Sequence, residues 1–68
     1  MQNFFIARRA DVWEVRLGKY LVSAQSSELD AIRIVQAIAR DIAARGSRSR
    51  LLVGDWNGEF REISIDRQ

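Results

Sequence analysis

Nucleophilic side chains are scarce in this sequence. Nucleophilic catalysis needs an activated serine, cysteine, threonine or lysine with a general base within hydrogen-bonding reach. Cysteine, histidine and threonine are absent. The serines occupy predicted strand, cap or loop positions with no evident base beside them: Ser23, Ser26, Ser27, Ser47, Ser49 and Ser64. We therefore expect a protein that is not an enzyme and has no catalytic residues.

Carboxylates offer little more. Paired acids can perform acid–base or glycosidic chemistry when they converge on one site. Glu59 and Glu62 are three residues apart in a predicted strand, so their side chains point to opposite faces. Asp55 is predicted to lie across a hairpin from Glu59 as a solvated turn acid. Residues 55–58 have the composition of a calcium-loop fragment but not its twelve-residue spacing. With histidine and cysteine missing as well, no metal site is expected.

Phosphate-binding loops are not evident either. The four glycines, Gly18, Gly46, Gly54 and Gly58, are scattered over two turns, a helix end and an expected β-bulge. A glycine-rich loop needs several backbone N–H groups close together around one phosphate. We therefore expect no nucleotide and no other cofactor.

Basic residues form two groups along the chain. The first surrounds the end of the predicted helix, and the second lies in or near the hairpin loops. The two groups are Arg45, Arg48 and Arg50, and Arg8, Arg9 and Lys19. Small domains of a sheet and a helix can present such residues to phosphates. However, the net charge is only +2, with nine acids interspersed among eleven cations. Low-specificity nucleic-acid binding is thus the alternative function, and a mixed-charge solvated surface is the simpler interpretation.

Several aromatic residues are candidates for contact with a partner. Exposed aromatic rings on a sheet anchor protein partners or stack on bases, whereas buried rings complete a core. Trp13 alternates with Val15 and Leu17, which assigns it to the core. The predicted interface residues are Phe4, Phe5, Trp56 and Phe60.

The length of the chain limits how much it can bury by itself. Residues 1–68 form one predicted domain, near the size at which a single hydrophobic core is only marginally sufficient. No disulfide can compensate, because there is no cysteine. Self-association is the remaining way to gain buried area. The amino terminus lacks the pattern of a signal peptide and no stretch is long enough to span a membrane, so a cytoplasmic location is expected.

Hydrophobic patterning predicts five strands and one helix. Residues 12–17 alternate between apolar and polar, and Gly18-Lys19 predicts a tight turn into the next strand. Ser27 is suited to cap a helix that ends near Arg45 and Gly46, with Glu28 and Asp30 in its first turn. Asn57-Gly58 predicts a hairpin between the last two strands. The expected strands are residues 4–7, 12–17, 20–24, 50–55 and 59–65.

The expected fold is α+β, in the order β-β-β-α-β-β. We predict an antiparallel sheet with the helix packed on one face. Phe4-Phe5-Ile6 and Leu51-Leu52-Val53 are continuously apolar, so apolar side chains should point to both faces of the sheet. One helix covers only one face, and a second copy could cover the other or pair with an edge. The sequence therefore predicts a homodimer. The simpler alternative is that Phe4 and Phe5 lie at a frayed end that exposes one ring.

Three segments resemble a family of short bacterial proteins catalogued only as a domain of unknown function. The family pairs an aromatic-rich hairpin with a capped helix and then a hairpin bearing Asp/Asn-Gly. The matching segments are 12–16, 27–31 and 52–60. Asp30-Ala31 departs from the usual Glu-Ala pair at the helix start, and Trp56 is inserted before the turn. The resemblance implies this fold and carries no established activity.

The sequence thus predicts a noncatalytic protein-interaction or assembly module of unknown partner. An accessory subunit of a larger complex is a third alternative.

Overall fold

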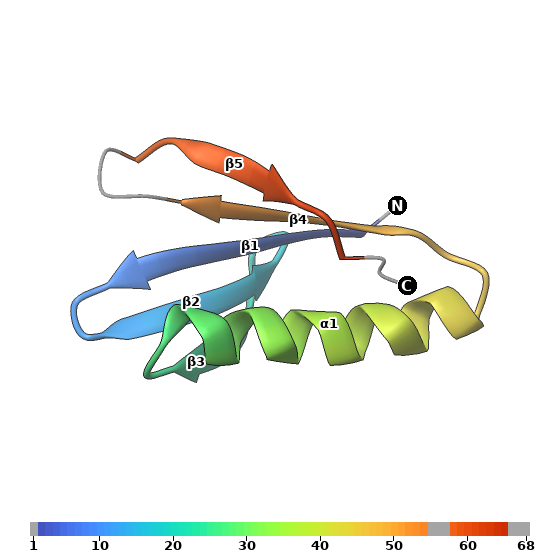
Figure 1. Ribbon diagram of the computed structural model, residues 1–68, viewed down its shortest axis with the longest axis horizontal. Coiled ribbons are helices and arrows are strands. Elements are labelled where there is room, and N and C mark those ends of the chain that lie inside the picture. The colour runs from blue at the N-terminus through green and yellow to red at the C-terminus, as the bar shows by residue number, and fades with distance from the viewer. Residues whose placement is uncertain (1, 55–57, 66–68) are drawn as a thin grey trace.

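The computed structural model describes residues 2–54 and 58–65 of the chain, which form a five-stranded sheet and one helix (Figure 1). Their bounds are β1 Gln2–Arg9, β2 Val12–Leu17, β3 Tyr20–Gln25, α1 Glu28–Ala44, β4 Ser49–Gly54 and β5 Phe60–Ile63. The element order matches the sequence prediction, and β2 has the predicted bounds. The expected fifth strand, residues 59–65, is shorter in the structure.

The sheet is mixed, so the prediction of a purely antiparallel sheet is wrong. The strand order is β3-β2-β1-β4-β5, and β1 pairs with β4 in parallel. The other three pairs are antiparallel. Helix α1 is the cause, because it carries the chain back along the sheet to the end where β1 begins (Figure 1). There β4 enters beside β1 in the same direction, with Phe4 opposite Leu51 and Ile6 opposite Val53.

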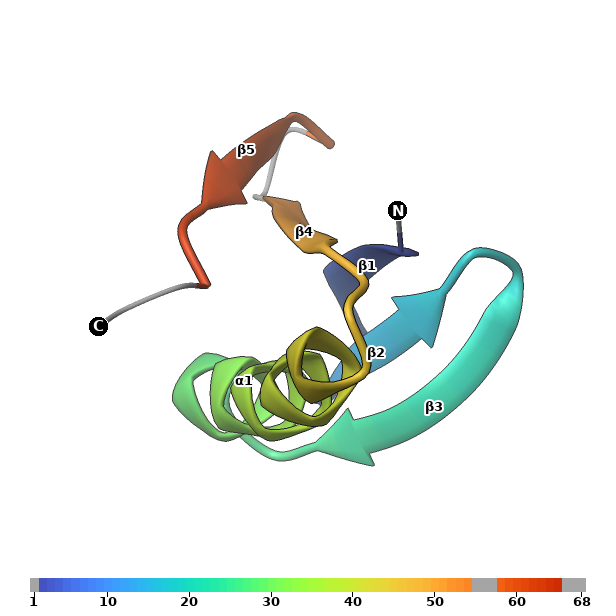
Figure 2. The same cartoon turned by 90° about the vertical axis from the view of Figure 1, so that its right-hand side faces the viewer.

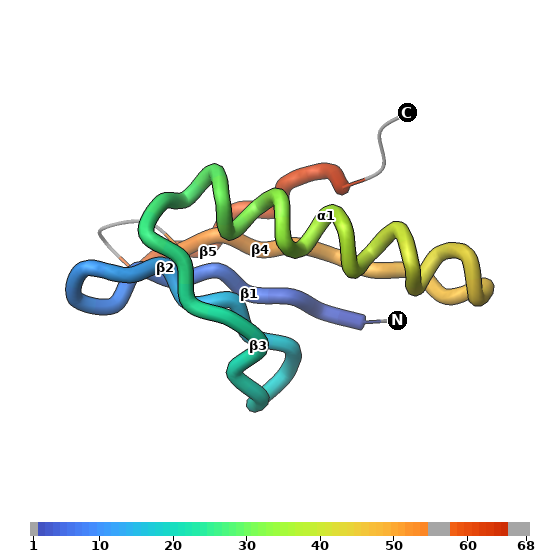
Figure 3. Tube along the Cα trace, turned by 90° about the horizontal axis from the view of Figure 1, so that it is seen from below, coloured from blue at the N-terminus to red at the C-terminus, as the bar shows by residue number. Residues whose placement is uncertain are grey.

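Helix α1 packs on one face of the sheet and contacts strands β1, β2, β3 and β4. Figure 2 shows the sheet curling around the helix, with β3 at one edge of the sheet and β5 at the other. Seen from below, the helix runs along the length of β1 and β4 (Figure 3). The core between these layers contains Phe4, Ile6, Val15, Ala31, Val35, Leu51 and Val53. Trp13 and Leu17 pack against it, as predicted for Trp13.

Both ends of the helix follow the predicted signals. The Ser27 hydroxyl accepts a hydrogen bond from the Asp30 backbone N–H at 3.1 Å, which satisfies one of the free donors of the first turn. The last turn closes through Arg45 N–H, which donates to the Ile42 carbonyl at 3.0 Å. Gly46 then adopts a φ of +89°, a left-handed conformation that favours glycine. No helix of the described residues is long and apolar enough to cross a membrane.

The irregularity in the sheet lies between β2 and β3. The register shifts there, because Val15 pairs with Ser23 whereas Arg16 pairs with Leu21. Strand β3 thus has one extra residue, Val22, which is the signature of a β-bulge. The sequence instead assigned a bulge to Gly54, and this is wrong: Gly54 pairs regularly with Phe60.

Candidate interaction surface

The face of the sheet opposite the helix is covered by no other element that the structure describes. We call it the open face. Phe4 and Ile6 are fully buried against the helix, so strand alternation turns the intervening Phe5 to the open face. Residues that pair with Phe5 on the neighbouring strands face the same way. Arg16 and Leu52 lie on either side of Phe5.

An aromatic pair occupies the open face across β1, β4 and β5. The rings of Phe5 and Phe60 meet edge to face, with their centroids 5.8 Å apart and an interplanar angle of 86°. Phe60 pairs with Gly54, whose missing side chain leaves room for the ring to reach across β4. A Cβ atom at Gly54 would lie 3.0 Å from Cε1 of Phe60. Phe60 nevertheless remains 47% exposed.

The bulge in β3 adds two aliphatic side chains to the same face. Leu21 lies opposite Arg16, which places it on the open face. Val22 directly precedes Ser23, the residue opposite the buried Val15, so alternation turns Val22 to the open face as well. Their exposed fractions are 53% for Leu21 and 40% for Val22. The open-face patch is therefore defined by Phe5, Leu21, Val22, Leu52 and Phe60.

Two ion pairs lie within this apolar surface. Arg16 contacts Glu14 at 3.1 Å on strand β2. Arg50 donates two hydrogen bonds to Glu62, from Nη2 to Oε1 at 2.8 Å and from Nε to Oε2 at 3.2 Å. The hydrogen bonds, and secondly the charge of the guanidinium, lower the pKa of the Glu62 carboxyl below its ordinary value. Each pair contributes one cation and one anion, so the two pairs add no net charge to the open face.

The structure places the predicted interface residues in different environments. Phe5 and Phe60 lie on the open face, as described above. Phe4 is fully buried beneath the helix, so it is not available to a partner, and its inclusion among the interface residues was wrong. Phe5 pairs with Leu52 on the open face, whereas Phe4 pairs with Leu51 in the core. Trp56 lies outside the described residues.

The six predicted nucleic-acid-binding residues separate into two ends of the sheet. Arg8 and Arg9 end β1, next to the turn that leads into β2. Lys19 follows β2, and Gly18 N–H donates to the Asn3 carbonyl at 3.4 Å, which places this turn beside the start of β1. Gln2 N–H donates to the Arg48 carbonyl at 2.9 Å at the same end. The structure therefore groups Lys19 with the helix-exit arginines rather than with Arg8 and Arg9.

Ion pairing neutralises two of the three helix-exit arginines. Arg45 contacts Asp41 at 3.4 Å, and Arg50 is held by Glu62. The Arg48 side chain forms no hydrogen bond or ion pair with any residue that the structure describes. At the opposite end, the Arg8 guanidinium lies 6.0 Å from the ring centroid of Trp13. Arg48 and Lys19 are thus the cations of the helix-exit end that no described acid neutralises.

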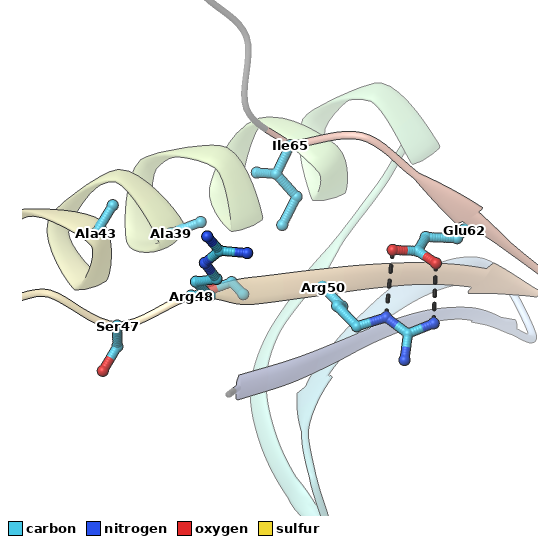
Figure 4. Close-up of a pocket in the computed structure, with 8 residues that line it drawn as sticks. Ala39, Ala43, Ser47, Arg48, Arg50, Glu62 and Ile65 are labelled. Atoms are coloured by element: carbon cyan, nitrogen blue, oxygen red, sulfur yellow. Dashed lines mark hydrogen bonds and ion pairs between the residues drawn. The ribbon is translucent and has the colours of Figure 1, made fainter.

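A groove of about 490 Å³ lies between the second half of α1 and strands β4 and β5 (Figure 4). Its residues are Ala39, Ala43, Ser47, Arg48, Ser49, Arg50, Glu62 and Ile65. The Ser49 hydroxyl is buried and has no hydrogen-bond partner among the residues that the structure describes. Within residues 2–54 and 58–65, no three acidic side chains come together in a way that could hold a metal ion.

The sequence reasoning missed three of the five residues of the open-face patch. It identified Phe5 and Phe60 but not Leu52, Leu21 or Val22, and strict alternation in β3 assigns the last two to opposite faces. Only the pairing of β3 with β2 reveals the bulge. The groove was also missed, since its walls come from segments that are distant in the sequence. The pair Arg50–Glu62, twelve residues apart, left no local signal.

Comparisons with known protein families, with curated proteins and with solved structures found no match to this chain. The resemblance of its three segments to a bacterial domain of unknown function therefore stays a prediction.

Proposed function

We propose that this protein is a noncatalytic interaction module that forms a homodimer through its open face. One observation carries the proposal: a single helix covers one side of the sheet, and apolar side chains of four strands, β1, β3, β4 and β5, lie on the other without a covering element among the described residues. Burying such a patch contributes about 25 cal/mol for each Å² removed from water, which offsets the entropic cost of association. The second copy of the chain is the partner that is always present.

The charges of the open face support a partner of the same kind. A twofold dimer brings the same surface of both copies together, so the surface must complement itself. Arg16–Glu14 and Arg50–Glu62 are internally neutral pairs, so two open faces can meet without a net repulsion. A surface with one dominant sign would oppose its own copy.

Sedimentation equilibrium tests this proposal. We expect twice the 7.8 kDa chain mass at tens of micromolar protein. Leu21→Lys should shift the mass toward the monomer, because it places a charge in the open-face patch. Leu29→Lys is the matched control, since Leu29 is 56% exposed and lies on the helix, away from the open face. A stable monomer at high micromolar concentration would overturn the proposal.

Low-specificity nucleic-acid binding remains the alternative, favoured by the grouping of Lys19 with Arg45, Arg48 and Arg50 at one end. Fluorescence anisotropy with labelled duplex and single-stranded oligonucleotides, at low and physiological salt, tests it. Phosphate contacts predict a steep loss of affinity with salt. Charge reversal at the three arginines should then abolish binding, and no binding at low salt would exclude this alternative.

A further inference from the structure

We propose that the groove between α1 and strands β4 and β5 binds a small organic carboxylate, with Arg48 as the residue that pairs with the carboxylate group. The groove borders the open face at the Arg50–Glu62 pair, but none of its lining residues belongs to the open-face patch. The argument rests on the shape of the groove, on its charges and on its apolar wall.

The groove exists because the helix does not reach the last strand. Helix α1 contacts the other four strands but makes no close backbone approach to β5. On the helical side, Ala39 and Ala43 are one turn apart and therefore share a face, where their methyl groups fill little space. At about 490 Å³, the groove falls within the range of about 300–1,000 Å³ that is typical of small-molecule sites.

The charges of the groove select a ligand with one negative charge. Among the described residues, three ionised side chains line it, two arginines and one glutamate. Arg50 is occupied by its two hydrogen bonds to Glu62. Arg48 is left with a guanidinium that no described residue engages, and Figure 4 shows this side chain directed toward the helix across the groove. A guanidinium matches a carboxylate through two parallel hydrogen bonds. The Glu62 carboxylate disfavours a doubly charged ligand such as a phosphate monoester.

The remaining residues suit the body of such a ligand. Ile65 points into the same space in Figure 4 and, with Ala39 and Ala43, forms an apolar wall. Ser47 and Ser49 also line the groove, although the Ser47 hydroxyl points away from the helix in Figure 4. The Ser49 hydroxyl is buried without a partner among the described residues, so it is the donor that a ligand oxygen would satisfy. The expected ligand is thus a carboxylic acid with a short apolar body.

Amide chemical shifts of the ¹⁵N-labelled full chain, titrated with sodium benzoate, test this inference at fixed ionic strength. We expect saturable shifts that concentrate at the groove, on Ala39, Ala43, Ser49 and Ile65. Benzamide, which has nearly the same shape without the charge, should bind at least about tenfold more weakly, because a charge-assisted pair is lost. Shifts without saturation, shifts scattered over all arginines, or equal binding of benzamide would overturn the inference.

Three variants locate the site. Arg48→Gln should weaken benzoate binding about tenfold or more. Arg45→Gln is the matched control, because Arg45 belongs to the same helix exit but does not line the groove, and it should bind as the wild type does. Ala43→Leu should block the groove and abolish binding while it keeps a good helix former. Wild-type affinity in both Arg48→Gln and Ala43→Leu would overturn the proposal. Sedimentation of the same samples reports the dimer independently, so the two proposals fail separately.

Discussion

The ring of Phe60 occupies the space above Gly54 that a side chain at this position would fill. A Cβ atom at Gly54 would approach Cε1 and Cζ of the ring to 3.0 and 3.1 Å. Through this gap the ring crosses β4 and meets Phe5 on β1. The glycine thus couples the last strand to the first through an aromatic contact, and the contact forms the centre of the open-face patch.

The effect of Gly54→Ala on the free energy of unfolding should therefore depend on whether residue 60 carries its aromatic ring. In a Phe60→Ala background the new methyl group finds space, and the less flexible unfolded chain gives a gain of about 0.4–1 kcal/mol. In the wild type the ring must leave Phe5, which costs about 0.5–1.5 kcal/mol and offsets that gain. Urea unfolding of the four proteins at one protein concentration measures this coupling. Equal effects of Gly54→Ala in both backgrounds would show that the ring is not seated there.

Phe4 and Phe5 should respond very differently to truncation, although they are neighbours. Phe4 is fully buried, and Phe4→Ala should cost about 3–5 kcal/mol. A small domain has little more than that in total, so we expect a largely unfolded protein by circular dichroism. Phe5→Ala removes a half-buried ring and should cost about 1–2 kcal/mol. Similar losses for the two variants would contradict the assignment of their faces.

The local elements could be predicted from the sequence because their signals are local. The alternation of residues 12–17, the Ser27 cap and the left-handed Gly46 each depend on a few neighbouring residues, and each is found in the structure. The parallel pairing of β1 with β4 could not be predicted in this way. It depends on where the helix returns the chain, and either direction of β4 satisfies the continuous apolar run of Leu51-Leu52-Val53.

The surfaces were harder to predict than the fold, because each combines distant residues. Alternation predicts that Phe4 and Phe5 point to opposite faces of the sheet, but it does not say which of the two faces the helix. Only the position of the helix in the structure decides this. Lys19 was grouped with Arg8 and Arg9 because all three belong to hairpin loops. The structure separates them, since one strand length lies between the two turns. Residue type and loop position therefore identified the cations but not their neighbours.

Ser27→Ala should destabilise the fold by about 1 kcal/mol, the usual cost of losing a helix N-cap. The hydroxyl satisfies the Asp30 N–H, and alanine leaves that donor without a partner in the protein. Ser26→Ala is the matched control, because Ser26 is exposed and precedes the cap. We expect its effect to stay within about 0.5 kcal/mol. Urea midpoints compared at one protein concentration measure both, and an equal loss in Ser26→Ala would contradict the role of Ser27 as the cap.

The Arg50–Glu62 pair should make a small part of the stability depend on acid pH. Arg50 lowers the pKa of Glu62 in the folded chain, whereas in the unfolded chain the carboxyl titrates near the ordinary value of about 4.3. The contribution is therefore fully present above about pH 4.3 and is lost as the pH falls through the lower pKa of the folded state. We expect the urea midpoints of the wild type and Glu62→Gln to differ by a small, constant amount from about pH 5 to 7 and to converge below about pH 4.3. The same substitution in an Arg50→Gln background is the control, because there the guanidinium that lowers the pKa is absent. A pH dependence that persists in that background would assign the effect to another group, and a difference that grows toward acid pH would reverse the sign derived from this pair.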